Sequence, residues 1–255
     1  MAAQLSVAII TRDEERNLGA CLRSVAWANE IVVVDSGSTD RTREIAREHG
    51  ARVIETADWL GFGAQKNRAI DACANEWILV LDADERVTDA LCAEIQSALA
   101  APSFDVYEMP RRSTYCGRFI RHSGWWPDHV RRLFRRGVAR YSDARVHENL
   151  LTDRPIGRLR APLLHYSFRS AEQVLGKVNR YSSEGAQMLI EQGRAPGLAS
   201  AVLHGLAAFF RTYVMKLGVL DGRYGFMLAV SNAEGSYYRY VKAMLAVQKK
   251  RDDAE

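Results

Sequence analysis

Two aspartates that follow an apolar run are the clearest sign of chemistry in this chain. The run Trp77-Ile78-Leu79-Val80-Leu81 has the composition of a buried strand, and Asp82-Ala83-Asp84-Glu85 follows it directly. In an extended chain residues two apart point to the same side, so Asp82 and Asp84 can face one divalent cation and, through it, a diphosphate. The leading interpretation is a metal-dependent site for a nucleotide sugar. The alternative is a solvated acidic turn before a helix capped by Thr88.

The elements that would position these aspartates alternate along the first hundred residues, as in a parallel sheet flanked by helices. Strands are expected at 6–10, 31–34, 52–55 and 77–81. Helices are expected at 15–25, 38–50 and 63–74, the second capped by the Ser38 hydroxyl and ended at Gly50. Polar loops follow three of the strands, at 11–15, 35–40 and 82–85. Such loops meet at one edge of a doubly wound sheet, which predicts a single pocket.

The rest of the chain changes character twice. Strands at 105–109 and 130–134 are expected to extend the sheet and supply the acceptor side of a cleft, and from Ser170 onward the pattern is helical. The predicted fold class is therefore α/β, a doubly wound, mostly parallel sheet with a helical C-terminal appendage. Within that appendage, residues 198–220 are apolar but interrupted by His204, Arg211 and Lys216, so a spanning helix is not expected.

Two interpretations of residues 198–220 stay open at this point. The segment can form an amphipathic helix in a membrane interface, with its aromatic side chains inserted and its basic side chains at the headgroups. Equally, it can pack on the rest of the protein. The aromatic residues are Phe209, Phe210 and Tyr213.

Composition limits the class of protein. A chain of 255 residues with 47% hydrophobic content can bury a full core and is neither disordered nor fibrous. The cysteines, Cys21, Cys73, Cys92 and Cys116, have neither disulfide-framework nor zinc-site spacing, and the start of the sequence has no export signal, which predicts a cytoplasmic protein with reduced thiols.

The net charge of +4 hides a strongly basic stretch between residues 110 and 160. An arginine excess of this kind indicates a phosphate-bearing partner, such as nucleic acid, phospholipid headgroups or a phosphorylated sugar. The arginines are Arg111, Arg112, Arg118, Arg121, Arg131, Arg132, Arg135, Arg136, Arg140, Arg145, Arg154, Arg158 and Arg160.

Several motifs taken together resemble those of family 2 glycosyltransferases. They are Thr11-Arg12-Asp13-Glu14-Glu15, Val32-Val33-Val34-Asp35-Ser36-Gly37-Ser38-Thr39-Asp40, Gly61-Phe62-Gly63-Ala64-Gln65-Lys66-Asn67-Arg68 and Leu81-Asp82-Ala83-Asp84-Glu85. Later motifs resemble the branch of the family that builds the lipopolysaccharide inner core, the core glucosyltransferases. These are Trp125-Trp126-Pro127-Asp128, Arg131-Arg132-Leu133-Phe134-Arg135-Arg136, Val146-His147-Glu148 and Asp221-Gly222.

The resemblance implies a GT-A fold, an inverting mechanism, a nucleotide-diphosphate sugar donor and a divalent cation, Mg²⁺ or Mn²⁺. Thr11 and Glu14 would border the nucleoside, Asp35 would contact the base or ribose, Asp82 would lie by the ribose, and Asp84 would ligate the metal. Many relatives carry a second aspartate where this chain has Ser36, which weakens the base-reading role of that loop.

The expected organisation is a GT-A domain at 1–168, followed by a helical region at 169–255 that is a candidate for membrane association. The domain has a nucleotide-sugar half at 1–100 and an acceptor half at 101–168. Lys66 or Arg68 would add a cation beside the diphosphate, or would be solvated on an amphipathic helix.

The acceptor side has its own candidates. Inverting transfer needs a base for the acceptor hydroxyl, and Glu148 is the candidate, unless it pairs with Arg145. His147 would orient Glu148 or touch the diphosphate, or is an ordinary loop residue. Trp125 and Trp126 would stack on a sugar or pack in a core. Of the alternating arginines, one set, including Arg131, would meet acceptor phosphates.

The function expected from all of this is transfer of a hexose, glucose from UDP-glucose, to a lipopolysaccharide inner-core acceptor at the cytoplasmic face of the inner membrane, with peripheral membrane contact. One alternative is another lipid-linked or surface glycan. Another is a non-enzymatic protein whose arginines bind nucleic acid or an anionic ligand, although a nucleic-acid partner is not expected. A nucleotidyltransferase is disfavoured because no early glycine-rich loop is present.

Overall fold

The structure is a computed structural model that describes residues 3–142 and 149–253. The chain divides into two compact units. The first comprises Met1–Arg111 and Asp128–His165, and the second comprises Arg112–Pro127 and Tyr166–Glu255. The division after residue 168 that the sequence suggests stays a prediction about domains.

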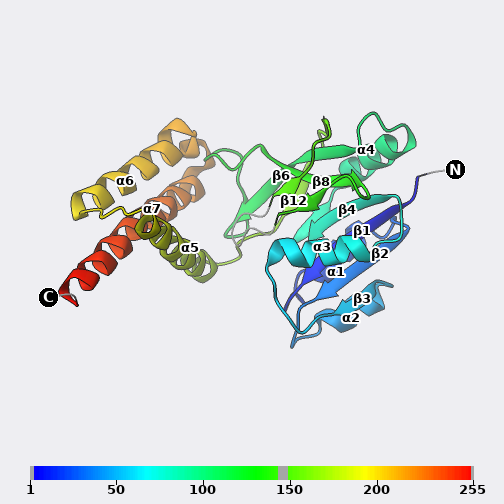
Figure 1. The fold of residues 1–255 in the computed structure, drawn as a ribbon. Helices are drawn as coiled ribbons and strands as arrows, with labels where there is room; N and C mark the ends of the chain where they lie inside the picture. Colours follow the sequence, from blue (N-terminus) through cyan, green and yellow to red (C-terminus); the bar gives the residue numbers. More distant parts are fainter. Residues whose placement is uncertain (1–2, 143–148, 254–255) are drawn as a thin grey trace. The chain divides into compact units, whose positions relative to one another are not determined.

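The first unit is built on one mixed sheet (Figure 1). Its strands are β1 (Leu5–Thr11), β2 (Glu30–Asp35), β3 (Arg52–Glu55), β4 (Trp77–Asp82), β5 (Glu85–Val87), β6 (Val106–Tyr115), β8 (Asp128–Arg135), β11 (Ile156–Arg158) and β12 (Leu163–His165). Their order is β3-β2-β1-β4-β8-β6-β12-β5, with β11 and the short β7 (Arg118–Phe119) also on β6. The pair β9 (Arg140–Tyr141) and β10 (Leu150–Leu151) stands apart.

Parallel and antiparallel pairing divide this sheet in two. Strands β1 to β4 pair in parallel, whereas β8 is antiparallel to both β4 and β6. The predicted α/β class is confirmed, and each of the six expected strands is present. The antiparallel additions are the reason that the second half of the chain lacks the strand-helix alternation of the first.

Helices cover both faces of the sheet because its strands are apolar on both sides. Val7 and Ile9 lie in a core with α1 (Leu18–Ser24), α2 (Thr42–Glu48) and α4 (Asp89–Ala100). Ala8 and Ile10 face the other way, onto α3 (Phe62–Ala72). Residues two apart along a strand share a face, so one strand serves two cores.

Helix starts test the capping predictions. The Thr88 hydroxyl accepts a hydrogen bond from the Leu91 amide at 3.2 Å, so it caps α4 as expected. The predicted cap at Ser38 is wrong: α2 begins at Thr42, and the Ser38 hydroxyl donates to the buried carboxylate of Asp35 instead. Satisfying that carboxylate keeps residues 36–41 out of the helix.

Strand register brings three motif residues to one edge of the sheet. Thr11 at the end of β1 is opposite Asp35 at the end of β2, and on the other side of β1, Ile10 is opposite Asp82 of β4. The chain crosses over between β1 and its two neighbours, and in α/β sheets ligands bind outside the strand ends at such a switch point. The single pocket that the loops predict would lie at this edge, and it stays a prediction.

The second unit is mainly helical. Its elements are α5 (Ala171–Glu191), α6 (Leu198–Phe210), a π-helical turn (Arg211–Met215), a 3₁₀ turn (Gly218–Asp221) and α7 (Gly222–Asp252). The Ser170 hydroxyl caps α5. The sharp turn into α7 requires a glycine at 225, because a Cβ there would collide with the carbonyl oxygen of Gly218.

Candidate functional site

Asp82 lies between two buried cations at the end of β4. Its Oδ1 is 3.0 Å from Nζ of Lys66, and its Oδ2 is 2.5 Å from Nη2 of Arg132. The side chains of Lys66 and Arg132 are only 3% and 5% exposed, whereas that of Asp82 is 27% exposed. Burial favours the neutral carboxyl, but Arg132 and Lys66 outweigh burial and hold the pKa of Asp82 well below its usual range. Asp82 is therefore ionised, and Lys66 and Arg132 balance its negative charge.

Glu85 extends this cluster into the interior. Its fully buried carboxylate is 2.7 Å from Nη2 of Arg132 and 3.4 Å from Nη1 of Arg111. The other Glu85 oxygen accepts a hydrogen bond from the Asp82 amide at 3.0 Å. Two arginines thus balance a carboxylate that holds the turn between β4 and β5 in shape. Glu85 positions Asp82 rather than facing a ligand.

Asp84, two residues after Asp82, has a different environment. Its Oδ2 lies 3.3 Å from Nε2 of His165, and the two side chains are 23% and 17% exposed. His165 ends β12, which pairs with β5 so that His165 is opposite Glu85. Within residues 3–142 and 149–253, no group of three His, Cys, Asp or Glu side chains converges where a metal ion would fit. Asp84 and His165 therefore offer one carboxylate and one imidazole, and a cation here would need further ligands.

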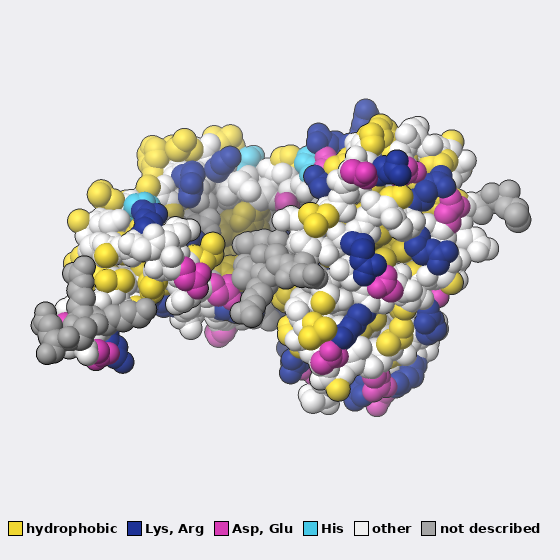
Figure 2. Space-filling view, in the orientation of Figure 1, with side chains coloured by type: hydrophobic (Ala, Val, Ile, Leu, Met, Phe, Trp, Pro, Cys, Tyr) yellow, Lys and Arg dark blue, Asp and Glu magenta, His cyan; other side chains and the backbone are white. Residues whose placement is uncertain are grey.

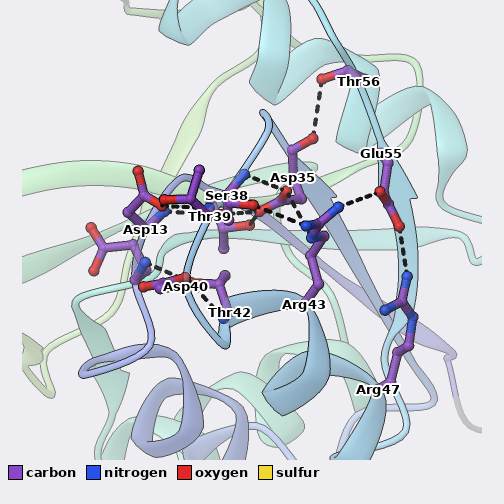
Figure 3. A network of polar contacts seen from close by, with 12 residues as sticks. Asp13, Asp35, Ser38, Thr39, Asp40, Thr42, Arg43, Arg47, Glu55 and Thr56 are labelled. Carbon is purple, nitrogen blue, oxygen red and sulfur yellow. Dashed lines mark hydrogen bonds and ion pairs between the residues drawn. The ribbon is translucent and has the colours of Figure 1, made fainter.

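Asp35 is the centre of a buried polar network (Figure 3). Its carboxylate accepts hydrogen bonds from the Thr11 hydroxyl at 3.0 Å and from the Ser38 amide at 2.9 Å, and also from the Ser38 hydroxyl. Arg43 approaches to 3.9 Å. Because Asp35 is fully buried and its oxygens are occupied, it holds the loops after β1 and β2 in place in this structure. Its contact with a base or ribose stays a prediction.

The loop after β1 is tied to the loop after β2 by further bonds. The Asp13 amide donates to the Ser38 hydroxyl at 2.9 Å, and the Glu14 amide donates to the Thr42 hydroxyl at 2.7 Å. The Glu14 carboxylate accepts a hydrogen bond from the Asn17 amide group at 2.7 Å. Thr11 and Glu14 therefore lie in a loop that hydrogen bonds hold against the loop after β2. Their role beside a nucleoside stays a prediction.

The two cationic side chains proposed on α3, Lys66 and Arg68, have different partners. Lys66 points inward, to Asp82 and to the ring of Tyr141, 5.1 Å from the ring centroid. Arg68 instead forms a two-pronged ion pair with Asp58 at 2.8 and 2.7 Å, near the surface. Of the two, only Lys66 belongs to the cluster around Asp82.

Three of the acceptor candidates lie within the described residues. Nη1 of Arg131 donates to the carbonyl oxygen of Leu150 at 3.1 Å. Trp125 packs against Tyr115 and Phe168 inside the second unit, as the core-packing interpretation expects. Trp126 contacts the guanidinium of Arg112, 4.6 Å from the ring centroid, while His147 and Glu148 lie outside the described residues. The acceptor-binding roles of all four stay predictions.

Sequence analysis did not single out Arg132, Glu85 and His165, which the structure places in contact with the acidic motif. The alternation of arginines in β8 contained a usable signal, since it required Arg131 and Arg132 to face opposite ways. Glu85 was visible within the acidic motif but carried no sign that it is buried. His165 had no local signal, because β12 meets β5 only through a long-range pairing.

The chain is similar in sequence to a known protein family and to several of its members. The sequence model of Glycosyl transferase family 2 matches residues 6–154. A lipopolysaccharide core biosynthesis glycosyltransferase, LpsC of Rhizobium meliloti, is 32% identical over 96% of this chain and 92% of that protein. An uncharacterized glycosyltransferase of Rickettsia bellii is 30% identical, over 95% of this chain and 86% of that protein.

A solved structure shares the fold. The crystal structure of S. aureus TarS 1-349 in complex with UDP-GlcNAc has a TM-score of 0.51 to this chain, at 14% identity, and covers 97% of this chain and 92% of that one. The expected GT-A fold is confirmed, and with the family match over more than half of the chain and a relative of similar length, the chain belongs to glycosyl transferase family 2 and is a glycosyltransferase.

Proposed function

We propose that this glycosyltransferase moves a hexose, glucose from UDP-glucose, to an acceptor of the lipopolysaccharide inner core, with inversion and with a divalent cation. The observation that carries the donor half of the proposal is the buried set of Lys66, Asp82 and Arg132 at the carboxyl edge of the sheet. The similarity to a lipopolysaccharide core biosynthesis glycosyltransferase supports the acceptor class. A UDP-sugar complex of the fold relative TarS supports the donor class.

Lys66 and Arg132 suit a site where negative charge accumulates. When the bond from sugar to diphosphate breaks, the leaving nucleoside diphosphate gains charge, and fixed cations stabilise it most where water is excluded. Nη2 of the buried Arg132 is shared between Asp82 and Glu85, which fixes its positive charge at the end of β4. Asp82 keeps these cations in position until the donor arrives.

Asp84 and His165 fit a divalent cation better than Asp82 does. Asp82 is already neutralised by two cations, whereas the partly exposed Asp84 and His165 present an oxygen and a nitrogen 3.3 Å apart. Mg²⁺ typically takes one or two carboxylates together with substrate phosphates and waters, so a pair of protein ligands suffices for a diphosphate complex. When bound, the ion supplies Lewis-acid stabilisation of the diphosphate.

The transfer step requires a base, and Glu148 is the proposed one. The acceptor hydroxyl oxygen forms a bond to the anomeric carbon as the bond from that carbon to the diphosphate breaks. The hydroxyl proton passes to the carboxylate, and the nucleoside diphosphate leaves with the bonding electrons. Glu148 lies outside the described residues, so its role rests on its place in the motif Val146-His147-Glu148.

The acceptor leaves one alternative in place, another lipid-linked or surface glycan. A lipid-linked acceptor would place the enzyme at the cytoplasmic face of a membrane. The non-enzymatic interpretation has lost its support, because the chain belongs to a family of enzymes.

The test is ligand-linked thermal stability followed by transfer. Purified protein is heated with UDP-glucose, UDP-galactose, UDP-N-acetylglucosamine, GDP-mannose or an ADP-heptose, each with and without Mn²⁺. Donor at 100 times its Kd stabilises the folded state by about 2.7 kcal/mol. We expect this rise for UDP-glucose with Mn²⁺, its loss in Asp84→Asn, and its retention in Asp153→Asn, a control acid whose side chain is 91% exposed.

The transfer arm uses deacylated inner-core oligosaccharide as acceptor. Glu148→Gln is expected to keep the thermal rise and lower turnover by roughly 100-fold or more, as for loss of a general base. A rise with another nucleotide class only would reject UDP-glucose. Unchanged turnover in Glu148→Gln would remove Glu148 from the chemistry.

A further inference from the structure

Helix α6 packs with its small side chains inward and its large apolar side chains outward. Ala201, Gly205 and Ala208 are buried. A Cβ on Gly205 would already lie 3.3 Å from Cβ of Tyr237, so α7 is closely packed along this face. On the other side, the side chains of Leu203, Leu206 and Phe210 are 65%, 63% and 56% exposed. A helix on the surface of a soluble protein has the reverse pattern, with large apolar side chains toward the core and polar side chains toward water.

The exposed apolar surface continues beyond α6. The π-helical turn, the 3₁₀ turn and the start of α7 add more large apolar side chains, each at least 40% exposed: Val214, Met215, Leu217, Val219, Leu220, Phe226 and Met227. We call these seven, with Leu203, Leu206 and Phe210, the apolar patch. Figure 2 shows hydrophobic side chains gathered over this unit with Lys and Arg among them. Large exposed apolar patches on soluble proteins mark interaction sites.

The exposed charges around the apolar patch are basic. Residues 192–220 contain no aspartate or glutamate, while Arg211 and Lys216 are exposed. The acid that follows, Asp221, has a side chain only 6% exposed, which accepts hydrogen bonds from the His122 amide and the Ser123 hydroxyl. Arg223, in the first turn of α7, is exposed as well. Large apolar side chains bordered by cations match the surface of an anionic bilayer, where acyl chains take the former and headgroups the latter.

Packing on α7 argues against α6 as a spanning helix. By length and composition, Leu198–Met215 suffices to cross a membrane, and 22% of it is buried. Yet α6 is bound along α7: the Asn232 side chain donates to the Thr212 hydroxyl at 3.1 Å, and the Ser236 hydroxyl donates to the His204 carbonyl at 3.2 Å. Crossing would bring Glu234 and Arg239 of α7 into hydrocarbon, at high cost.

A second copy of the chain fits the patch less well than a bilayer. In a two-fold dimer the same patch meets itself, so Arg211, Lys216 and Arg223 would approach their own copies with no acid in residues 192–220 to balance them. Like charges placed together across an interface oppose association. An anionic surface supplies the missing negative charge.

We propose that the apolar patch docks the enzyme on an anionic bilayer, with α6 lying in the interface plane. Leu203, Leu206 and Phe210 enter the acyl boundary, and Arg211, Lys216 and Arg223 contact anionic headgroups. This inference uses neither the donor site nor the acceptor, so it stands or falls separately from the proposed function.

The experiment is flotation of the full-length protein with vesicles that contain no glycan acceptor. Vesicles of phosphatidylethanolamine and phosphatidylglycerol are compared with vesicles of phosphatidylcholine alone. We expect binding to the anionic vesicles only, and release by alkaline carbonate. Leu203→Ser with Leu206→Ser is expected to lower the partition coefficient at least about tenfold, because two apolar side chains lose their burial.

Matched variants distinguish binding through the apolar patch from nonspecific adsorption to vesicles. Leu175→Ser with Met188→Ser removes two side chains of α5 that are 55% and 59% exposed and is expected to bind as the wild type does. Arg211→Gln with Lys216→Gln should weaken binding roughly tenfold to thirtyfold at low salt, at about 1 kcal/mol per cation. Arg180→Gln with Lys249→Gln, two exposed cations of the same unit, should have little effect.

Three results would overturn the proposal. Wild-type flotation by the Leu203→Ser, Leu206→Ser variant would mean that the patch does not dock. Resistance to carbonate would indicate a spanning segment. Absence of vesicle binding together with a wild-type dimer that this variant dissociates, measured by light scattering, would make a second copy the occupant. Circular dichroism of each variant confirms that the helices remain folded.

Discussion

The carboxyl edge of the sheet and the outer face of α6 depart from the ordinary arrangement of a soluble protein in opposite directions. At the sheet edge, Lys66, Arg132 and Glu85 are charged and buried. On α6, leucines and a phenylalanine are exposed while alanines and a glycine are buried. Charged residues are almost never fully buried unless paired, and large exposed apolar patches mark interaction sites.

The two regions differ in whether the interaction partners of their side chains lie within the protein. The sheet edge is complete in itself, because each buried charge has a partner of opposite sign within 3.5 Å. The face of α6 is incomplete, because its large side chains stay exposed among the residues that the structure describes. Disturbing the first region should therefore reduce stability as well as activity, whereas disturbing the second should leave the fold intact and change only what the protein binds.

The largest expected effect is at Arg132. Replacing Arg132 by Met leaves the carboxylates of Asp82 and Glu85 without their shared partner, and breaking a buried ion pair in this way costs about 3–5 kcal/mol. Urea unfolding measures the loss. Arg131→Met is the control, since Arg131 is exposed and donates to the Leu150 carbonyl oxygen rather than to a carboxylate of the cluster. Equal losses in the two variants would contradict the claim that Arg132 holds the cluster together.

Lys66 should matter for donor binding more than for folding. Because Arg132 still neutralises Asp82 in Lys66→Met, the main loss is a charged hydrogen-bond donor for the diphosphate, worth about 1.5–3 kcal/mol. Donor affinity should fall roughly tenfold to hundredfold, measured by titration calorimetry with UDP-glucose and Mn²⁺. Arg68→Met, which breaks the surface pair with Asp58, should leave the affinity unchanged. Similar losses in both would show that α3 acts through net charge alone.

The two faces of α6 can be compared directly. Gly205→Leu inserts a side chain where Tyr237 and Ala233 leave only 3.3 to 3.4 Å for a Cβ, and overpacking of this kind costs about 1–3 kcal/mol. Leu206→Ser on the exposed face should change the free energy of unfolding by less than about 0.5 kcal/mol. Thermal unfolding of both variants tests this. A marked destabilisation by Leu206→Ser would show that Leu206 is packed in solution.

Glu30, at the opposite end of β2 from Asp35, is expected to give a modest effect that depends on pH. Burial raises its pKa, but the Ala74 amide, the Ser6 hydroxyl and Arg52 together lower it below the ordinary 4.5. A lowered folded-state pKa stabilises the protein above pH 4.5, and this stabilisation is lost as pH falls through the folded-state value. Glu30→Gln should therefore destabilise by about 1 kcal/mol at pH 7 and by less below pH 4.5. A pH series of urea midpoints measures this, and a difference that does not change with pH would exclude the linkage.

Prediction from sequence succeeded where the signal is local. Apolar runs in the sequence indicate six of the strands: β1, β2, β3, β4, β6 and β8. The cap at Thr88 depends only on its hydroxyl and an amide three residues later. It failed at Ser38, whose hydroxyl had two possible partners, a helix amide and a carboxylate three residues before it. The buried carboxylate won, because leaving it unsatisfied costs more than losing one cap.

The sequence by itself determined the positions along the chain of β1, β2, β3, β4, β6 and β8, the acidic motif after β4 and the family, because hydrophobic period and motif spacing are properties of the chain. Only the tertiary structure decided that Asp82 is neutralised by Lys66 and Arg132 while Asp84 meets His165. It alone turned the large side chains of α6 outward. The physical reason is that ion pairing and burial depend on distances between residues far apart in the chain, which local pattern does not encode.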